Sequence, residues 1–218
     1  MVEQLRKCFA EKANPENAVY MSKYMKNHFP FFGIKATERR EIQKAYFQQS
    51  GRLKAPFDEQ FVLGLWKQPE REFQLAAIDY IVHLQKRLPK TKMDLLETLI
   101  TTKSWWDTVD TLAQKPVGTI VANYPKLVAR VDEWAVAENM WLRRTAILYQ
   151  LKYKENTDEA RLYHFIRLNA DSKEFFIQKG IGWALREYSK TNPNSVKLFI
   201  KENRLAPLSV REGSKYLS

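Results

Sequence analysis

The chain has 218 residues, of which 44% are hydrophobic and 28% charged, a composition that favours one large domain or an array of small repeated units. No run of 18 apolar residues occurs and the mean hydropathy is −0.50, so we expect no membrane-spanning segment. The charged N-terminal sequence lacks the apolar core of a signal peptide, which predicts a cytosolic location. A single cysteine, Cys8, and three widely separated histidines offer no ligand-like spacing, so we expect no metal and no other cofactor.

The net charge of the chain is +11, from 36 Lys and Arg against 25 Asp and Glu. The excess is concentrated toward the C-terminus, because residues 139–218 carry 15 basic and 8 acidic side chains. Such a charge balance is typical of proteins that bind a polyanion, above all nucleic acid. We therefore expect the last third of the chain to form the polyanion-binding face.

Helical periodicity dominates the sequence, and no stretch that alternates apolar and polar residues predicts a strand. Only seven glycines and nine prolines interrupt it. The predicted helices, in chain order, span residues 59–68, 72–88, 93–102, 104–115, 117–123, 127–137, 140–153, 158–169, 174–190 and 194–202. The predicted fold class is all-α.

An internal repeat becomes visible when the apolar residues near the starts of successive helices are compared. These anchors recur at intervals of 32 to 37 positions: Phe73, Trp105, Leu142, Ile177 and Val210. Most residues four and seven positions beyond each anchor are also apolar, which is the spacing of one buried helical face. A period near 35 with two helices per unit predicts an α-solenoid of tandem HEAT-like repeats, one domain over residues 1–218 with a concave basic cleft.

Two capping boxes are consistent with this register. Ser104 is followed three residues later by Asp107, and Ser209 is followed three residues later by Glu212. The capping position accounts for Asp107, to which we assign no chemistry.

The unit anchored at Trp105 departs from the pattern at two positions next to its buried face. The position after the anchor is polar in the other units but is Trp106 here, and Asp110 stands where three other units have Ile78, Ile147 and Gly182. The two side chains lie on one helical face, four residues apart. Residues that break a local pattern without structural need are candidates for function. The alternative interpretation is that Trp106 packs against a neighbouring unit and Asp110 pairs with a nearby Arg.

A line of cations around an indole follows one face of the last long predicted helix. Its members, Lys179, Trp183, Arg186 and Lys190, are spaced as i, i+4, i+7 and i+11. Cations that neutralise phosphates and a ring that stacks are typical of a nucleic-acid contact surface. Arg144 is equivalent to Lys179 in the preceding unit and extends this surface. The alternative is a solvated basic face with a partly buried Trp183.

The candidate residues lie within strings that are specific enough to identify a family. The strongest are Thr102-Lys-Ser-Trp-Trp-Asp-Thr-Val-Asp110, Trp141-Leu-Arg-Arg144 and Gly182-Trp-Ala-Leu-Arg-Glu-Tyr188. They closely resemble the AlkD family, bacterial DNA glycosylases built from HEAT-like repeats that excise alkylated purines. The resemblance continues through Tyr24-Met-Lys-Asn-His-Phe29 and Thr191-Asn-Pro193, so it covers nearly the whole chain.

The resemblance implies a catalytic group of four side chains. Asp110 is implied to be the essential carboxylate, and Trp106 and Trp183 to embrace the sugar-phosphate of the lesion. Arg144 is implied to hold the DNA backbone beside them. The implied reaction is hydrolysis of the N-glycosidic bond of cationic N3- or N7-alkylated purines, by carboxylate stabilisation of an oxocarbenium-like sugar. We expect neither a general acid nor a pocket that receives a flipped base.

The remaining expected contacts are with the DNA backbone. The resemblance implies that Arg186 binds a phosphate and that Tyr24 lies at the edge of the cleft, while Lys179 and Lys190 extend the basic line. The implied partner is duplex DNA, bound by a monomer in the bacterial cytosol or nucleoid without an obligate protein partner. Two departures stand out, since Ala36-Thr37 replaces the usual Thr-Pro and Gly180 replaces the commoner Ala.

Three alternative functions are compatible with a basic solenoid. A reader of single-stranded RNA would need a repeated pair of base-reading positions, and the residues after the anchors show no such code. A protein-binding adaptor leaves Trp106 and Asp110 without a role. A catalytically silent HEAT-repeat protein that binds DNA structure has the same charge and shape, and only an excision assay separates it from the enzyme.

Overall fold

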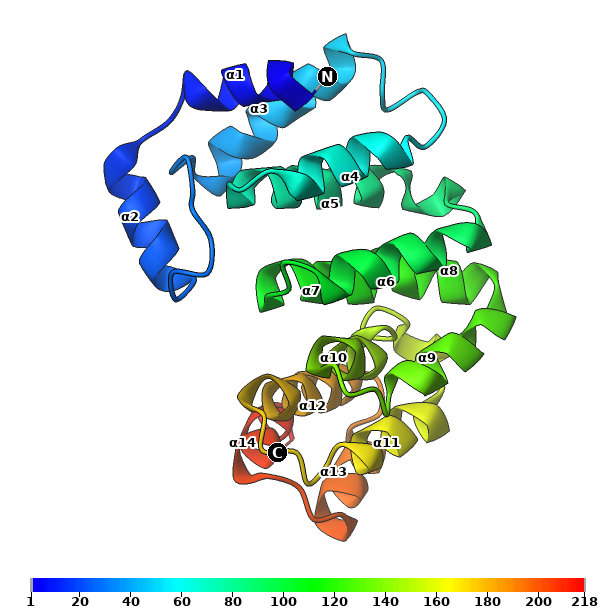
Figure 1. Ribbon diagram of the computed structural model, residues 1–218. Helices are drawn as coiled ribbons and strands as arrows, with labels where there is room; N and C mark the ends of the chain where they lie inside the picture. The colour runs from blue at the N-terminus through cyan, green and yellow to red at the C-terminus, as the bar shows by residue number, and fades with distance from the viewer. Residues whose placement is uncertain (1, 218) are drawn as a thin grey trace. The chain divides into compact units, whose positions relative to one another are not determined.

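A computed structural model describes residues 2–217, and within that range every element of regular secondary structure is a helix (Figure 1). The all-α prediction is confirmed. Contacts between residues divide the chain into two compact units, which separate after Leu88. None of the helices in the described range is long and apolar enough to cross a membrane. The prediction of one repeat domain over residues 1–218 stays a prediction.

The first unit contains five α-helices and ends on a single 3-10 turn. Their bounds are α1 (Val2–Ala10), α2 (Pro15–Tyr24), α3 (Ala36–Gln49), α4 (Glu59–Lys67), α5 (Arg71–Leu84) and η1 (Gln85–Arg87). Helix α5 packs against α4, and its face of Phe73, Ala77 and Tyr80 is fully buried.

The second unit carries all the candidate catalytic residues. Its elements are η2 (Lys90–Lys92), α6 (Met93–Thr101), α7 (Trp106–Leu112), η3 (Ala113–Val117), α8 (Gly118–Asn123), η4 (Pro125–Leu127), α9 (Val128–Trp134), α10 (Met140–Leu148), η5 (Lys154–Asn156), α11 (Glu159–Leu168), α12 (Phe175–Tyr188), α13 (Pro193–Glu202) and α14 (Pro207–Gly213). Helix α10 is central to the site because it packs against both α7 and α12.

The helices α1, α2 and α3 were not among those predicted. Helix α2 buries none of its residues, so it has no apolar stripe that could reveal it. The buried face of α3 includes two polar side chains, Arg39 and Gln43, in places where a pattern search expects apolar ones. Helix α1 is a single short amphipathic stretch with Leu5 and Phe9 buried.

The predicted buried stripe is confirmed in the units centred on α5, α10 and α12. The anchors Phe73, Leu142 and Ile177 are all buried, as are the residues four and seven positions beyond them. The anchors Trp105 and Val210 are only half-buried. Trp105 precedes the first turn of α7 as its N-cap residue, because the helix begins one residue later than the repeat pattern requires.

Both predicted capping boxes are wrong. The hydroxyl of Ser104 donates to the carbonyl oxygen of Ile100, 2.6 Å away, instead of accepting a bond from the first turn of α7. Ser209 lies inside α14, where its hydroxyl donates to the carbonyl oxygen of Gln178 at 2.9 Å. The motif fails because α7 begins after Trp105 and α14 begins at Pro207, so neither serine occupies an N-cap position.

A π-helical turn, η3, joins α7 to α8 and contains Pro116. The chain packs closely just beyond it. A Cβ atom at Gly118 would lie 2.6 Å from the carbonyl oxygen of Tyr149, so only glycine fits at this contact with the end of α10. The hydroxyl of Tyr153 donates to the carbonyl oxygen of Gly118 at 2.7 Å. These contacts fix the C-terminal end of the helix that carries Asp110.

Candidate functional site

The centre of the site is a buried ion pair between α7 and α10. Arg144 Nε donates to Asp110 Oδ1 at 2.7 Å, and Arg144 Nη2 donates to Asp110 Oδ2 at 2.8 Å. Two parallel bonds of this kind fix both the position and the plane of the carboxylate. The structure therefore brings together the two residues for which the sequence predicted separate roles, a catalytic carboxylate and a phosphate ligand.

Both partners are almost withdrawn from solvent. Asp110 is 8% exposed and Arg144 is 4% exposed. Burial raises the pKa of the Asp110 carboxyl, because the charged form loses its hydration, and the hydrogen bonds and charge of Arg144 oppose that shift. Asp107, one turn earlier on α7, adds a smaller upward effect on this pKa by like-charge repulsion.

The guanidinium of Arg144 is held from a third side by α12. Its Nη1 donates to the carbonyl oxygen of Phe176 in the first turn of that helix. A Cβ atom at Gly180 would lie 3.0 Å from Nη1 and 3.6 Å from Cγ of Arg144. The glycine that the sequence marked as a departure from the family thus leaves room for the guanidinium against the α12 backbone.

Aromatic rings pack beside this arginine. The ring of Phe176 lies 5.0 Å from those of Trp105 and Trp141, centre to centre, and 5.9 Å from the Arg144 guanidinium carbon. Such contacts restrict the side chain of Arg144 and exclude water from one side of the ion pair.

The two predicted indoles are both half-buried. Trp106 begins α7 one helical turn before Asp110, so the two residues share a face of that helix. Trp183 lies three residues beyond Gly180 on α12, on the side of that helix nearest Arg144. The ion pair is thus flanked by α7 and α12, each of which carries one partly exposed indole.

The cations of the predicted basic line already form ion pairs within the protein. Lys179 and Arg186 are each 3.1 Å from a different oxygen of Glu212 on α14. Lys190, two residues beyond the end of α12, is 2.6 Å from Glu187 in the last turn of that helix and lies 5.5 Å from the centre of the Tyr216 ring. Carboxylates therefore already engage the three cations that were expected to contact DNA.

Glu212 is the site residue that sequence reasoning misinterpreted. The predicted capping box places it at the start of α14, yet its side chain is 9% exposed and also pairs with Lys215 at 2.8 Å. Hydrogen bonds from Lys215 and Lys179 lower the pKa of Glu212 to about 2. The signal that could have found it is its place in the repeat, two positions after the anchor Val210, where the two preceding units have Lys179 and Arg144.

Tyr24, the remaining predicted DNA contact, ends α2 in the first unit. It is 69% exposed, and Tyr20 one turn earlier is 71% exposed. The side chain therefore has the exposure that a contact residue needs, and its role at the edge of a cleft stays a prediction.

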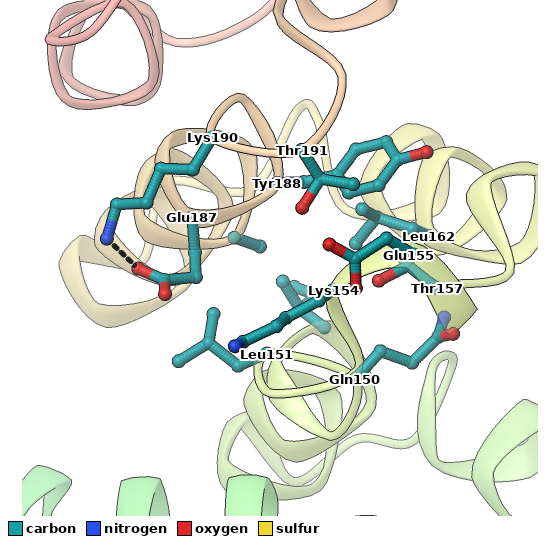
Figure 2. Close-up of a pocket in the computed structure, with 12 residues that line it drawn as sticks. Gln150, Leu151, Lys154, Glu155, Thr157, Leu162, Glu187, Tyr188, Lys190 and Thr191 are labelled. Atoms are coloured by element: carbon teal, nitrogen blue, oxygen red, sulfur yellow. Dashed lines mark hydrogen bonds and ion pairs between the residues drawn. The ribbon is translucent and has the colours of Figure 1, made fainter.

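A pocket of about 250 Å³ lies farther along α10 and α12, and none of the candidate catalytic residues lines it. Its walls come from the ends of these helices and from the segment before α11. Figure 2 shows Lys190 paired with Glu187 on the α12 side, facing Lys154 and Leu151. Asp110 therefore acts outside this pocket if it acts on a ligand.

Within residues 2–217, no three His, Cys, Asp or Glu side chains are grouped so that they could hold a metal ion. The acidic and basic groups of the site instead pair with each other. The arrangement offers a carboxylate fixed by Arg144, one partly exposed indole on each of α7 and α12, and cations paired with Glu212 between α12 and α14.

Comparison with known proteins bears directly on the family. Residues 5–217 match the family described as DNA alkylation repair enzyme. A solved structure of a predicted DNA alkylation repair enzyme from Enterococcus faecalis is 39% identical, with a TM-score of 0.87, and the match covers 94% of this chain and 97% of that one.

Two solved structures from Streptococcus mutans share the fold at 18% identity. AlkD2 has a TM-score of 0.61, with 85% of this chain and 91% of that chain covered. The protein designated smu.31, from strain UA159, has a TM-score of 0.59, with 83% and 98% covered. A search of curated proteins finds no match. The fold, the resemblance of the Trp-Trp-Asp and Gly-Trp motifs, and a match over nearly the whole length agree, and the chain belongs to the DNA alkylation repair enzyme family.

Proposed function

We propose that this protein is a monofunctional DNA glycosylase, which hydrolyses the N-glycosidic bond of N3- and N7-alkylated purines in duplex DNA and leaves an abasic site. The observation that carries the proposal is the Asp110 carboxylate, fixed through both oxygens by Arg144 and placed on one helical face with a half-exposed Trp106. A carboxylate fixed in this way is suited to stabilise positive charge that develops near it.

The substrate class follows from the chemistry available. An N3- or N7-alkylated purine carries a positive charge, so when its bond to C1′ breaks the electron pair leaves with the base and neutralises it. No general acid has to protonate the leaving base. Positive charge then develops on the deoxyribose, and water adds to C1′ and gives up one proton. Asp110 is proposed to stabilise that cationic sugar and to orient the water.

The ion pair leaves the carboxylate able to do this. Each carboxylate oxygen has two lone pairs, and Arg144 uses one on each oxygen. We propose that the lone pairs that Arg144 does not use accept from a water molecule or face the sugar in the complex with DNA. Arg144 is thus proposed as a positioning residue for Asp110, in addition to the backbone contact that the family resemblance implies.

The two indoles add selectivity for cations. An aromatic face attracts a positively charged nucleotide by roughly 0.5–2 kcal/mol, depending on desolvation. We propose that Trp106 and Trp183 contact the damaged nucleotide, and that the cations along α12 and α14, together with Tyr24, bind the DNA backbone. Because carboxylate and indoles both act more strongly on a charged nucleoside, neutral bases are rejected without a fitted pocket. The proposed protein acts as a monomer in the bacterial cytosol or nucleoid.

An excision assay tests the proposal directly. Purified protein is incubated with methylated duplex DNA, and released 3-methyladenine and 7-methylguanine are quantified by mass spectrometry against a no-enzyme control. We expect release of both bases and the appearance of abasic sites without strand cleavage. Binding of the same duplex without base release contradicts the proposed enzyme.

That outcome would favour the alternative, a catalytically silent protein that binds DNA structure. One observation is in its favour, because a buried Asp110 fully paired with Arg144 is also what a purely structural ion pair looks like. The assay separates the two functions, since both predict binding and only one predicts a free base.

A further inference from the structure

Four cations, two on α12 and two on or just beyond α14, surround the carboxylate of Glu212. Lys179 and Arg186 on α12 each lie 3.1 Å from one of its oxygens, and Lys215, just beyond α14, lies 2.8 Å away. Arg211 lies 4.0 Å from it. One carboxylate bound through both oxygens by three basic side chains, with a fourth at 4.0 Å, has the arrangement of a bound phosphate.

The carboxylate is buried against α12. Its side chain is only 9% exposed. A Cβ atom on Gly182 would lie 2.5 Å from the Cβ of Glu212, so the backbones of α12 and α14 already touch at this position. The cations are the more accessible partners, because the side chains of Lys179, Arg186 and Lys215 are 36%, 25% and 48% exposed. A ligand that competes for them must draw these cations outward.

Phosphate is such a ligand. We propose that Glu212 is an internal counter-ion of the DNA-binding surface, which occupies Lys179 and Arg186 in the free protein and with which the phosphates of DNA compete. The inference rests on the proposed function in one respect, that the ligand of this face is duplex DNA. Glu212 thereby lowers the affinity for any duplex, damaged or not, and shortens the time spent on undamaged DNA.

The test is the salt dependence of binding to undamaged duplex by wild-type protein and by Glu212→Gln. Glutamine preserves the shape that packs against Gly182 and removes the charge. Releasing two partly exposed ion pairs predicts binding tighter by roughly 3- to 20-fold. The plot of log affinity against log salt should become steeper by about one phosphate contact.

Glu97→Gln is the matched control. Glu97 on α6 pairs with Arg130 on α9 at 2.6 Å, so the substitution changes the net charge by the same amount and also breaks an ion pair. We expect its affinity and salt dependence to remain within about twofold of wild type. Lys179→Gln gives a second measurement, because it should weaken binding more in the Glu212→Gln background than in the wild type.

Unchanged or weaker duplex binding by a folded Glu212→Gln protein, or an equal gain in the Glu97→Gln control, overturns the inference. If Glu212→Gln loses its cooperative melting transition, Glu212→Asp replaces it, since it keeps the charge but withdraws the carboxylate from Lys179 and Arg186. Tighter binding is again expected, and its absence again overturns the inference. Base release by the wild-type protein is measured separately, so failure of the glycosylase proposal is distinguishable from failure of this one.

Discussion

At the scale of single residues, two opposing effects act on the ionisation of the Asp110 carboxyl. Burial disfavours its charge, while Arg144 holds both of its oxygens and favours the ionised form. Removing one partner of such a buried pair commonly costs about 3–5 kcal/mol, because the other charge is left without compensation. Substitutions at Asp110 therefore affect stability as well as chemistry, and an experiment must separate the two.

Asp110→Asn is the variant that makes this separation. We expect it to abolish single-turnover release of 7-methylguanine while duplex affinity stays unchanged or rises slightly, since a carboxylate near phosphates opposes binding. A lower melting temperature should accompany the loss, because Arg144 then lacks its charged partner. Activity is compared well below that melting temperature.

Asp107→Asn serves as the control on the same helix. It removes one acidic group from the first turn of α7, which should cost about 0.3–1 kcal/mol through the helix dipole. Base release should persist. An Asp110→Asn protein with the wild-type rate, or an Asp107→Asn protein as inactive as Asp110→Asn, would contradict the assignment of the catalytic carboxylate.

The pH dependence of excision follows from the raised pKa of Asp110. The ionised form is the active one, so the rate should fall as the pH drops through a value above the ordinary aspartate pKa of 3.8. Asp107→Asn should move this acid limb to lower pH, because it removes one of the upward influences on the Asp110 pKa. Single-turnover rates are measured against pH after subtraction of spontaneous depurination. An acid limb that Asp107→Asn leaves unmoved would place the titrating group elsewhere.

At the scale of elements, the contact between α12 and α14 positions the basic groups. It depends on Gly182, where a Cβ atom would lie 2.5 Å from the Cβ of Glu212 and 3.1 Å from the carbonyl oxygen of Ser209. These are backbone and near-backbone atoms, which cannot yield as the end of a long side chain can. The glycine is therefore required by packing between helices, although it weakens α12 taken alone.

Gly182→Ala should for this reason destabilise the protein. Alanine gains up to about 1 kcal/mol of helix propensity, but forcing α14 away from α12 should cost about 1–3 kcal/mol and prevail. Gly64→Ala in α4 is the control, since its nearest contact is a methyl group of Val2 at 3.1 Å, and we expect it to be neutral or stabilising. Denaturant unfolding of both variants gives the comparison. A Gly182→Ala protein as stable as wild type would contradict the close contact.

Sequence periodicity predicted the helices of the second unit well because their buried faces are apolar. Leu142 and Ala146 on α10 repeat at the spacing that a helix imposes, and both are buried. The pairing of Asp110 with Arg144 could not be read in the same way, although it was left open as an alternative. It depends on where α7 begins and on the space at Gly180, and both are set by contacts between helices.

The sequence predicted cations on α12 that are available to DNA, and it could not show that Glu212 pairs with them. Lys179 and Arg186 form a continuous line on α12, but their common partner Glu212 is 33 and 26 residues away in the chain. A pattern confined to one helix shows the cations and omits the carboxylate that a neighbouring helix brings to them.

At the scale of the whole molecule, the separation of Asp110 from the pocket bears on lesion size. The pocket of about 250 Å³ includes none of the four candidate catalytic residues. If Trp106, Asp110 and Trp183 act only on the sugar and on charge, the size of the alkyl group has little effect. A glycosylase that receives a flipped base in a closed pocket has the opposite property.

We therefore expect bulky cationic N7 or N3 adducts to be released at rates comparable to those of methylated purines, within about tenfold. Hypoxanthine and uracil, which are small and neutral, should remain in the DNA because neither indole nor carboxylate favours them. Single-turnover release of a bulky adduct, 7-methylguanine and hypoxanthine is compared on one duplex sequence. Exclusion of the bulky adduct, or release of hypoxanthine, would show that a fitted pocket selects the base.

The π-helical turn between α7 and α8 rotates the side chains of α7 about the helix axis relative to those of α8. A π turn holds one residue more than an α turn, and one residue corresponds to about 100° of rotation. Because Gly118 fixes α8 against the end of α10, that rotation sets the direction in which α7 presents Asp110. Deleting Gln114 would remove one residue between α7 and α8 and rotate α7 by about 100° relative to α8. This should turn Asp110 away from Arg144 and abolish single-turnover excision without altering any charged residue. The length of the segment between α7 and α8 therefore matters for the orientation of Asp110 as much as the identity of residue 110 matters for its charge.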